Sequence, residues 1–584
     1  MRIEIGRYAG FCRGVKHAVD GAFACARENA EIVYADGELI HNPQTLELLR
    51  RHGMETLGDA DESVESARGR VVIVRAHGVP PERLVRLRAV AREVCNLTCR
   101  DVAKVQGIVR KYSRRGFSVV IFGKADHPEV RGLLGHATNG FTVLTPEDID
   151  RLPDLDRVAL VSQTTMNHEA FSAVAERVAA RFDDAEIIDT ICDATELRQN
   201  EVREMAKRSD AVLVIGGERS SNTRRLYEIA VEETRAHLVS DATEVRNLNL
   251  AGVRSLAVTA GASTPDWLIH EVVEEVRRTA HRPLARALRG LLLFSLYSKL
   301  FVALGAFLLS LAVADNLAVP WSLEIAVLVS LYYLAMSLMN AYTSRASVSI
   351  DNARRYRFMI RWRGVFAAIF AASVAVVLVI AVSLGHDVLW LTLLSLLLGV
   401  AYNLSYLPLT GENERILFLR KRDLLALKSV VISVAVTLLL NGLPLLGRLS
   451  SPSGDPSFAD VVTSLGFSFS IYFVFMLMFT REALFELKTA QTDRIAGVSS
   501  LLHLLSSRQI TAVLYALPAV LLVIMVVGVV TGLYPLDKAK YFVAVVYSYV
   551  VIALARRRRL LYDELGFELV VDSGLYVAGI VALL

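Results

Sequence analysis

The feature that most constrains this 584-residue chain is the series of long apolar stretches that fills its second half. The hydrocarbon core of a bilayer is roughly 30 Å thick, so a spanning helix needs about 20 apolar residues. Because every backbone polar group must find a partner inside lipid, such stretches fold as helices. The sequence predicts an all-α polytopic membrane bundle of about nine helices, at residues 291–313, 320–341, 364–385, 388–408, 424–446, 461–480, 510–532, 541–555 and 570–584.

Basic side chains collect in the loops after every second stretch. They lie in the segments Arg345–Arg363, Arg415–Arg422, Arg481–Arg494 and Arg556–Arg559, whereas the loops around Asp315, His386, Gly454 and Tyr534 carry few cations. Loops rich in Lys and Arg stay on the cytoplasmic side of a membrane. The protein is therefore predicted to be a multi-pass protein of the inner (cytoplasmic) membrane, with its N-terminal domain in the cytoplasm.

The first half is charged and has no apolar run of membrane length. Its start has no apolar core of signal-peptide length, which agrees with a cytoplasmic location. The formal net charge of the whole chain is only +4, so nucleic acid is not an expected partner. We expect a soluble domain at 1–280, a basic linker at 281–290 and a membrane domain at 291–584.

Short apolar runs alternate with helical patterns through the soluble half. This alternation is typical of β-α-β units with largely parallel sheets. In open α/β sheets, ligands bind beyond the carboxyl ends of the strands. The polar residues that follow the runs at 71–74, 119–122, 158–161, 211–215 and 255–258 are therefore the candidate site residues.

Three cysteines lie in turn-like settings at nearly even spacing: Cys12, Cys99 and Cys192. Three α/β lobes that each give one thiolate would hold a four-iron cluster with one iron free to bind a ligand. The spacing is unlike that of zinc fingers, which disfavours zinc. Cys25 and Cys95 are expected to be small buried core residues.

Imidazoles, a carboxylate and a set of hydroxyl and amide groups follow the predicted strands. Such donors suit an anionic, phosphate-like ligand. The residues are His41, His77, His127, Glu129, Thr164, Ser220, Ser221, Asn222 and Ser263. A helix cap is an alternative role for Glu129 and for the Ser220–Asn222 segment.

These segments, in this order, resemble the IspH (LytB) family of 4-hydroxy-3-methylbut-2-enyl diphosphate reductases. The likeness runs from Gly10-Phe11-Cys12 to Thr264-Pro265-Asp266, about the first half of the chain, and includes His127-Pro128-Glu129 and Gln163-Thr164-Thr165. It implies an α/β three-lobed pseudo-symmetric domain around an iron–sulfur cluster. It also implies reduction of an allylic diphosphate to isopentenyl and dimethylallyl diphosphate.

The resemblance also implies a role for each site residue. Cys12, Cys99 and Cys192 would bind the 4Fe–4S cluster, and Glu129, Thr164 and His127 would be catalytic. The substrate diphosphate would lie among His41, His77, His127, Ser220, Ser221, Asn222 and Ser263, with Thr164 near the substrate hydroxyl. An electron donor such as ferredoxin or flavodoxin would be needed.

Two residues depart from the family pattern. Asn96 stands where the family usually has Asp, and Arg100 stands where it usually has Pro. Neither change removes a cluster ligand. An extra cation beside a cluster is expected to raise its reduction potential.

The membrane half resembles the UbiA superfamily of intramembrane prenyltransferases. The likeness rests on nine predicted spans with polar cytoplasmic loops after the second and sixth, and on degenerate forms of two acidic motifs. The residues concerned are Asn340, Asp351, Arg481, Glu482, Glu486, Asp493 and Arg494. The first motif lacks a carboxylate before Asp351, and Mg²⁺ prefers carboxylate ligands, so both Mg²⁺-dependent transfer and a simple anchoring role stay open.

The two resemblances together predict a reductase tethered to a membrane domain that binds or transfers prenyl groups. Membrane lipid is an expected partner, either as anionic headgroups at the basic loops or as an acceptor. The alternative is a prenyl-lipid transferase or lipid-binding membrane protein in which the cluster-binding half is a sensor.

Overall fold

A computed structural model describes residues 1–29, 31–58, 61–218, 220–280, 283–404, 428–449, 465–496 and 500–584. The chain forms two compact units, Met1–Ala280 and His281–Leu584. Residues 283–290, expected to be a linker, form the first turns of a helix, α11 (Pro283–Tyr297).

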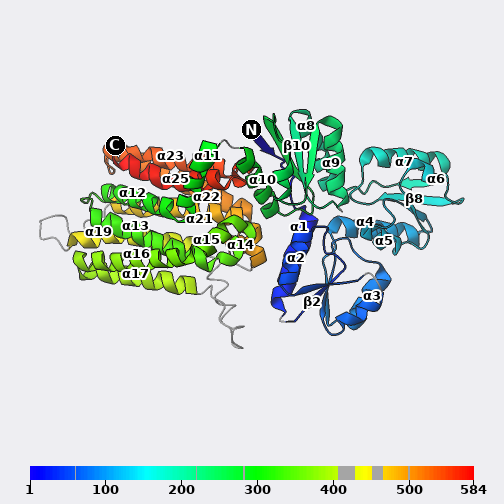
Figure 1. Cartoon of the computed structure of the whole chain (residues 1–584), viewed down its shortest axis with the longest axis horizontal. Helices are drawn as coiled ribbons and strands as arrows, with labels where there is room; N and C mark the ends of the chain where they lie inside the picture. Colours follow the sequence, from blue (N-terminus) through cyan, green and yellow to red (C-terminus); the bar gives the residue numbers. More distant parts are fainter. Residues whose placement is uncertain are drawn as a thin grey trace. The chain divides into compact units, whose positions relative to one another are not determined.

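The N-terminal unit consists of three lobes, each built on a four-stranded parallel sheet (Figure 1). Lobe A contains β1 (Arg2–Ile5), β10 (Ala211–Ile215), β11 (Arg235–Val239) and β12 (Ser255–Ala260). Lobe B contains β2 (Val33–Asp36), β3 (Met54–Leu57), β4 (Val71–Val74) and β5 (Glu93–Asn96). Lobe C contains β6 (Ser118–Phe122), β7 (Gly140–Val143), β8 (Arg157–Ser162) and β9 (Asp184–Ile187).

All three sheets have the same topology. The spatial orders are β3-β2-β4-β5, β7-β6-β8-β9 and β11-β10-β12-β1. Counted within each lobe, the order is second, first, third, fourth, and in lobe A the fourth strand is β1 from the start of the chain. Arg2 accordingly pairs with Ser255. The predicted three-lobed α/β fold is confirmed.

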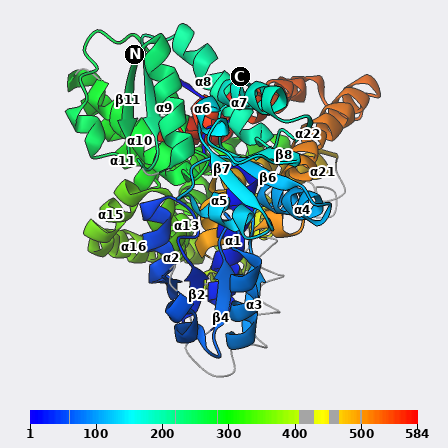
Figure 2. The ribbon, with the colours of Figure 1, turned by 90° about the vertical axis from the view of Figure 1, so that its right-hand side faces the viewer.

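Helices connect and cover the sheets. They are α1 (Arg13–Glu28), α2 (Pro43–Arg51), α3 (Pro81–Val90), α4 (Arg100–Arg114), α5 (Pro128–Leu134), α6 (Pro146–Ile149), α7 (His168–Arg181), α8 (Asp193–Lys207), α9 (Ser221–Glu233) and α10 (Asp266–Ala280). In Figure 2, α3 lies beside β2 and β4 of lobe B. The central strands β6 and β10 are buried along their whole length, which explains their unbroken apolar sequences.

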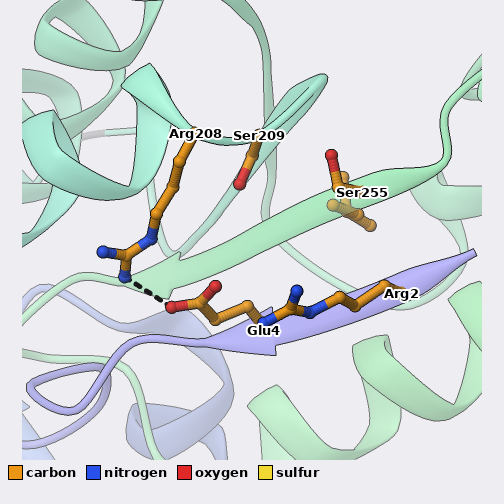
Figure 3. A pocket seen from close by; sticks show the side chains of 6 residues that line it. Arg2, Glu4, Arg208, Ser209 and Ser255 are labelled. Atoms are coloured by element: carbon orange, nitrogen blue, oxygen red, sulfur yellow. Dashed lines mark hydrogen bonds and ion pairs between the residues drawn. The ribbon is translucent and has the colours of Figure 1, made fainter.

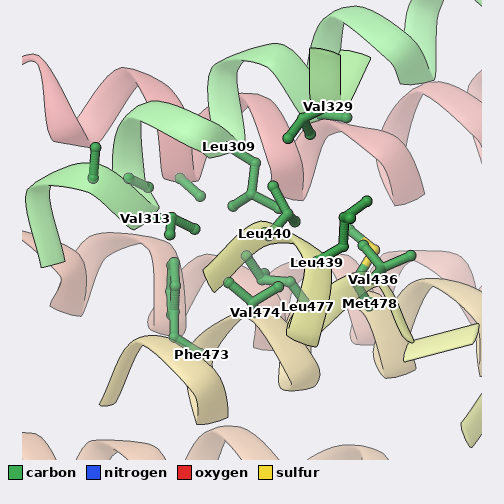
Figure 4. Packing of buried hydrophobic residues seen from close by; sticks show 14 of the residues in the cluster. Leu309, Val313, Val329, Val436, Leu439, Leu440, Phe473, Val474, Leu477 and Met478 are labelled. Atoms are coloured by element: carbon green, nitrogen blue, oxygen red, sulfur yellow. The ribbon is translucent and has the colours of Figure 1, made fainter. Parts of the chain in front are cut away.

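The second unit is helical. Its helices are α11, α12 (Leu300–Asn316), α13 (Leu323–Thr343), α14 (Arg345–Asp351), α15 (Ala353–Arg361), α16 (Arg363–Leu384), α17 (His386–Leu404), α19 (Lys428–Leu449), α21 (Leu465–Ala496), α22 (Ser507–Val530), α23 (Phe542–Ala555), α24 (Arg558–Leu561) and α25 (Glu564–Ala582). Its core contains Leu309, Leu440, Phe473 and Val474, which interleave between α12, α19 and α21 (Figure 4).

Seven helices in the described part of this unit are long and apolar enough to cross a membrane. An eighth span forms if α11 and α12 are counted together, but they bend by 67°. The break lies at Lys299, whose φ of 64° is left-handed. The predicted stretch 291–313 is therefore kinked, and the apolar part of α17, His386–Val400, is short for a span. The loops at Arg415–Arg422 and Gly454 lie outside the described residues.

Candidate functional site

Each of the three predicted cluster cysteines follows the fourth strand of a lobe and caps the next helix. Cys12 is the N-cap of α1, Cys99 of α4 and Cys192 of α8. The Cys12 Sγ accepts a hydrogen bond from the backbone N–H of Val15 at 3.4 Å. The unpaired N–H groups of a helix start favour negative charge, which suits metal-bound thiolates.

The three thiols face a common region. A Cβ placed on Gly14 would lie 2.3 Å from the Sγ of Cys99, so this glycine allows Cys99 to approach the helix that Cys12 caps. Burial raises the pKa of Cys99 to about 11, and the Cys12 thiol adds to that rise. Burial likewise raises the pKa of Cys192, again with a contribution from Cys12.

Three half-buried thiols at three helix N-termini fit an iron–sulfur cluster, because thiolates hold such clusters and metal binding displaces thiol protons. The flanking Arg100 is exposed at the first position of α4, where a proline would also fit. Asn96 accepts hydrogen bonds from the N–H and hydroxyl of Thr98, at 3.1 and 2.6 Å, and so shapes the turn before Cys99.

Three imidazoles form a compact cluster. The rings of His41 and His77 stack with centroids 4.6 Å apart, and His127 lies 5.6 Å from the first and 5.4 Å from the second. One ring nitrogen from each lies within 4.8 Å of the others. Each side chain follows a central strand, His41 after β2, His77 after β4 and His127 after β6.

Two of the three imidazoles, His77 and His127, are uncharged before a ligand binds. Burial lowers the pKa of His77 well below its usual value, and the neighbouring His41 and His127 add to that effect. Burial and the charge of His41 lower the pKa of His127 to about 4. The Nδ1 of His77 is buried and has no hydrogen-bond partner among the described residues. Such an atom is expected to bind a ligand group.

Glu129 and Thr164 form a buried pair between α5 and the end of β8. The Thr164 N–H donates to Oε1 of Glu129 at 2.7 Å, and its hydroxyl donates to Oε2 at 3.0 Å. Glu129 is 2% exposed. Burial raises its pKa to about 7 against the opposing effect of these hydrogen bonds. The carboxyl group can therefore hold or release a proton near neutral pH.

The predicted serine and asparagine residues lie on lobe A and reach toward the other lobes. The Ser221 and Thr165 hydroxyls are 3.3 Å apart, and the Ser263 hydroxyl donates to the His41 carbonyl at 3.2 Å. Ser220 caps α9, as the alternative reading of this segment allowed. Asn222 is 4% exposed, yet neither polar atom of its side chain has a hydrogen-bond partner among the described residues.

The sequence interpretation missed two features beside this site. Thr165 adjoins Thr164 in the same motif and links lobe C to Ser221. Cys25 and Cys95 are not core residues as expected, because both are half-buried and their sulfur atoms lie 3.0 Å apart. Thr165 could have been predicted because it is next to Thr164 in the same motif. No local sequence pattern could have predicted the contact of Cys25 with Cys95, which are 70 positions apart.

A second hollow lies at the opposite, amino edge of the lobe A sheet (Figure 3). It is lined by Arg2, Glu4, Arg208, Ser209 and Ser255. Arg208 and Glu4 form an ion pair of 2.5 Å across it. Because ligands of open α/β sheets bind at the carboxyl ends of strands, this hollow is not the candidate site.

The predicted polar residues of the membrane unit are mostly paired. Arg481 contacts Asp572 at 2.7 Å and Glu482 at 2.5 Å. Asp493 accepts a hydrogen bond from Ser347 at 2.6 Å, and Glu486 accepts from Ser429 and from the Leu501 N–H. Asn340 contacts Ser344 at 3.4 Å, Asp351 ends α14, and Arg494 lies in the last turn of α21.

The contact of Arg481 with Asp572 was not predicted, and neither was the ion pair of Arg355 with Glu568 at 2.7 Å. Within the described residues of this unit, no three carboxylate, imidazole or thiol groups gather at metal-binding distances. The Mg²⁺-dependent role that the sequence left open therefore has no three-ligand cluster to support it in that part of the unit.

The family model of the LytB protein matches residues 3–277. The 4-hydroxy-3-methylbut-2-enyl diphosphate reductase of Pelobacter propionicus is 37% identical over 278 residues, which cover 47% of this chain and 98% of that protein. The reductase of Aquifex aeolicus is 39% identical, over 47% of this chain and 96% of that protein.

Solved structures resemble each half. A structure of (E)-4-hydroxy-3-methyl-but-2-enyl diphosphate reductase is 38% identical, covers 47% of this chain and 99% of its own, and has a TM-score of 0.39. The apo structure of a UbiA homolog from Aeropyrum pernix K1 is 17% identical over 47% of this chain and 97% of its own, with a TM-score of 0.34. Given its relatives and its family model, the N-terminal half of this chain belongs to the LytB family.

Proposed function

We propose that the N-terminal unit is a 4-hydroxy-3-methylbut-2-enyl diphosphate reductase. The observation that carries the proposal is that three helix-capping thiols face a common region beside the Glu129–Thr164 pair, since the Cys192 N–H donates to the Thr164 carbonyl at 3.0 Å. The reaction adds two electrons and two protons to the allylic alcohol. The C–O bond breaks, water leaves, and isopentenyl or dimethylallyl diphosphate remains.

Cys12, Cys99 and Cys192 would hold a 4Fe–4S cluster, which supplies electrons and a Lewis-acidic iron when bound. Hydroxide is a poor leaving group and must be protonated as it departs. Glu129, with its pKa of about 7, holds a proton for this purpose in a site from which water is largely excluded. The Thr164 hydroxyl and N–H fix the orientation of that carboxyl group.

The imidazole cluster binds the diphosphate. A buried anion stabilises imidazolium, so binding raises the low pKa values of His77 and His127 and draws in protons. Ser221, Asn222 and Ser263 from lobe A supply further hydroxyl and amide donors. Because the three lobes each contribute part of this set, the ligand itself holds them together.

In this proposal the second unit anchors the enzyme and the N-terminal unit lies on the cytoplasmic face of the inner membrane, a location supported by the excess of basic residues in alternate loops. Electrons then come from a soluble carrier such as ferredoxin or flavodoxin. Buried ionisable residues within a bundle mark functional sites, so the Arg481–Asp572 and Arg355–Glu568 pairs make this unit a candidate prenyl-binding or prenyl-transferring domain.

Anaerobic purification in detergent tests the reductase. Mössbauer and EPR spectra should report a four-iron cluster, and a reductant with 4-hydroxy-3-methylbut-2-enyl diphosphate should yield both C5 diphosphates. Cys192→Ser should lose the cluster and the activity. A wild-type protein that binds no cluster after reconstitution would refute the proposal.

Labelled reductase substrate tests the membrane unit. Transfer of label into lipid, with no added prenyl synthase and with Mg²⁺ present or chelated, would indicate a transferase and its metal requirement. If no label appears in lipid, the result would favour an anchoring role for the second unit. Cluster loss in Cys99→Ser with membrane activity retained would instead favour the sensor alternative.

A further inference from the structure

Helix α1 presents a strip of small residues to the segment that runs from β5 to Cys99. A Cβ on Gly14 would lie 2.3 Å from the Cys99 Sγ, and one on Gly21 would lie 2.7 Å from Cδ2 of Leu97. The next contact along is Cys25 with Cys95, whose sulfur atoms are 3.0 Å apart. Since residues 95, 97 and 99 alternate along extended backbone, they face one side, and the segment lies along α1.

The two thiols are positioned for bond formation. Cys25 lies in the fourth turn of α1, and Cys95 lies on β5, one of the two edge strands of lobe B. Both residues are half-buried, so small reagents can reach them. A disulfide needs its sulfur atoms about 2.05 Å apart, so an approach of roughly 1 Å closes the bond.

The pair is distinct from the proposed cluster ligands but lies on the same two elements. Cys25 belongs to the helix that Cys12 caps. Cys95 is four residues before Cys99 on the strand that leads to it. Burial and the contact with Cys95 raise the pKa of Cys25 to about 12, and burial raises the pKa of Cys95. Both thiols are therefore mostly protonated near neutral pH, and their oxidation proceeds through the small fraction that is thiolate.

We propose that Cys25 and Cys95 form a reversible disulfide, a redox modification site separate from the iron–sulfur centre. The oxidant is a small-molecule disulfide of the glutathione class. One cysteine, as thiolate, attacks that disulfide, forms a mixed disulfide and releases one thiol. The second cysteine then attacks the protein sulfur of the mixed disulfide and releases the second thiol, so two protein thiols are oxidised and one disulfide is reduced.

The bond would tie α1 to β5 and so fix the register between the turns that contain Cys12 and Cys99. A loop of about 70 residues would be closed, which restricts the unfolded chain more than the folded one. This consequence concerns the proposed cluster ligands, but the disulfide itself does not depend on the reductase proposal.

The test uses the full-length protein in detergent, incubated without oxygen in buffers of graded glutathione and glutathione disulfide. Free thiols are then alkylated in denaturant, and the protein is digested with trypsin and read by mass spectrometry. The expected product joins the peptide His17–Arg27 to the peptide Glu93–Arg100, with the loss of two alkylatable thiols. Fragmentation between Cys95 and Cys99 identifies which cysteine of the second peptide is linked.

Cys25→Ser and Cys95→Ser are the matched controls, and each should abolish the linked peptide and give a glutathione adduct on the remaining thiol. Iron content and the visible spectrum, recorded on the same samples, report the cluster independently. A linked peptide that appears only after the protein is unfolded in urea would overturn the proposal. So would two thiols in the native protein that each take glutathione and never join.

Discussion

The three-lobed site and the Arg481–Asp572 region of the membrane unit differ in how their buried polar groups are satisfied. At the three-lobed site, His77 and Asn222 present buried polar atoms that have no hydrogen-bond partner among the described residues. In the membrane unit, Arg481 and Arg355 are buried against Asp572 and Glu568. Buried polar groups without partners cost free energy, and a bound ligand can recover that cost. The comparison indicates a ligand site in the first half whose polar atoms lack internal partners, whereas at the candidate site of the second half the Arg481 and Asp572 charges are already paired.

The largest effect is expected at Glu129. Replacing the proton donor in Glu129→Gln should lower kcat by about 10²- to 10⁴-fold. Since burial raises the pKa of Glu129 to about 7, the acid form declines as the pH rises through that value, and the wild-type rate should fall with it. Single-turnover rates across this range provide the measurement. A Glu129→Gln rate close to wild type would remove the carboxyl group from the chemistry.

The next largest effect should show whether the Arg481–Asp572 ion pair of the membrane unit stabilises the fold or binds a ligand. Arg481→Ala leaves the buried carboxylate of Asp572 without its cationic partner and should destabilise the unit by about 3–5 kcal/mol. The double variant Arg481→Met with Asp572→Leu should recover most of that loss. Thermal unfolding in detergent measures both. If Arg481→Ala is as stable as wild type but no longer binds prenyl diphosphate, the pair is a binding site and the comparison fails.

Asn222→Ala should give the reverse pattern. Its side chain has no hydrogen-bond partner among the described residues, so the loss in the free energy of unfolding should not exceed about 1 kcal/mol, the typical value for a point substitution. Binding of the substrate or of pyrophosphate should weaken by roughly tenfold, the value of one hydrogen bond to a charged group. Calorimetric titration and thermal unfolding of the same preparations test it. A large loss of stability would mean that Asn222 has a structural role.

The smallest effect is a change in bound protons. His77 and His127 have lowered pKa values and are neutral near pH 7. A bound diphosphate raises those pKa values, so binding should take up protons from solution. Calorimetry in buffers of different ionisation enthalpy measures this uptake, which His127→Gln should reduce. Proton release on binding would contradict the proposed electrostatics.

The sequence predicted five of the six central strands, all except β2, and missed the edges. The predicted runs correspond to β4, β6, β8, β10 and β12, all of which have neighbours on both sides. Edge strands such as β9, which is largely exposed, lack an apolar run and give no such signal. The placement of site residues after central strands was predictable because that is where parallel sheets bind ligands.

Contacts between distant residues were not predictable. Arg481 meets Asp572 across 91 positions, and Cys25 meets Cys95 across 70. Helix packing and strand register bring these pairs together, and no short pattern encodes either. For the same reason the kink at Lys299 was missed, because a left-handed lysine has no distinct sequence signature.

Lobe A is completed by the first strand of the chain, and this has a consequence for biosynthesis. During translation β1 leaves the ribosome early, but its partner β12 ends only at Ala260. The first helix of the second unit begins shortly afterwards, at Pro283. Domains generally fold as they emerge during translation. Lobes B and C can fold on the growing chain, while the third lobe closes at about the time when the nascent protein must engage the membrane-insertion machinery.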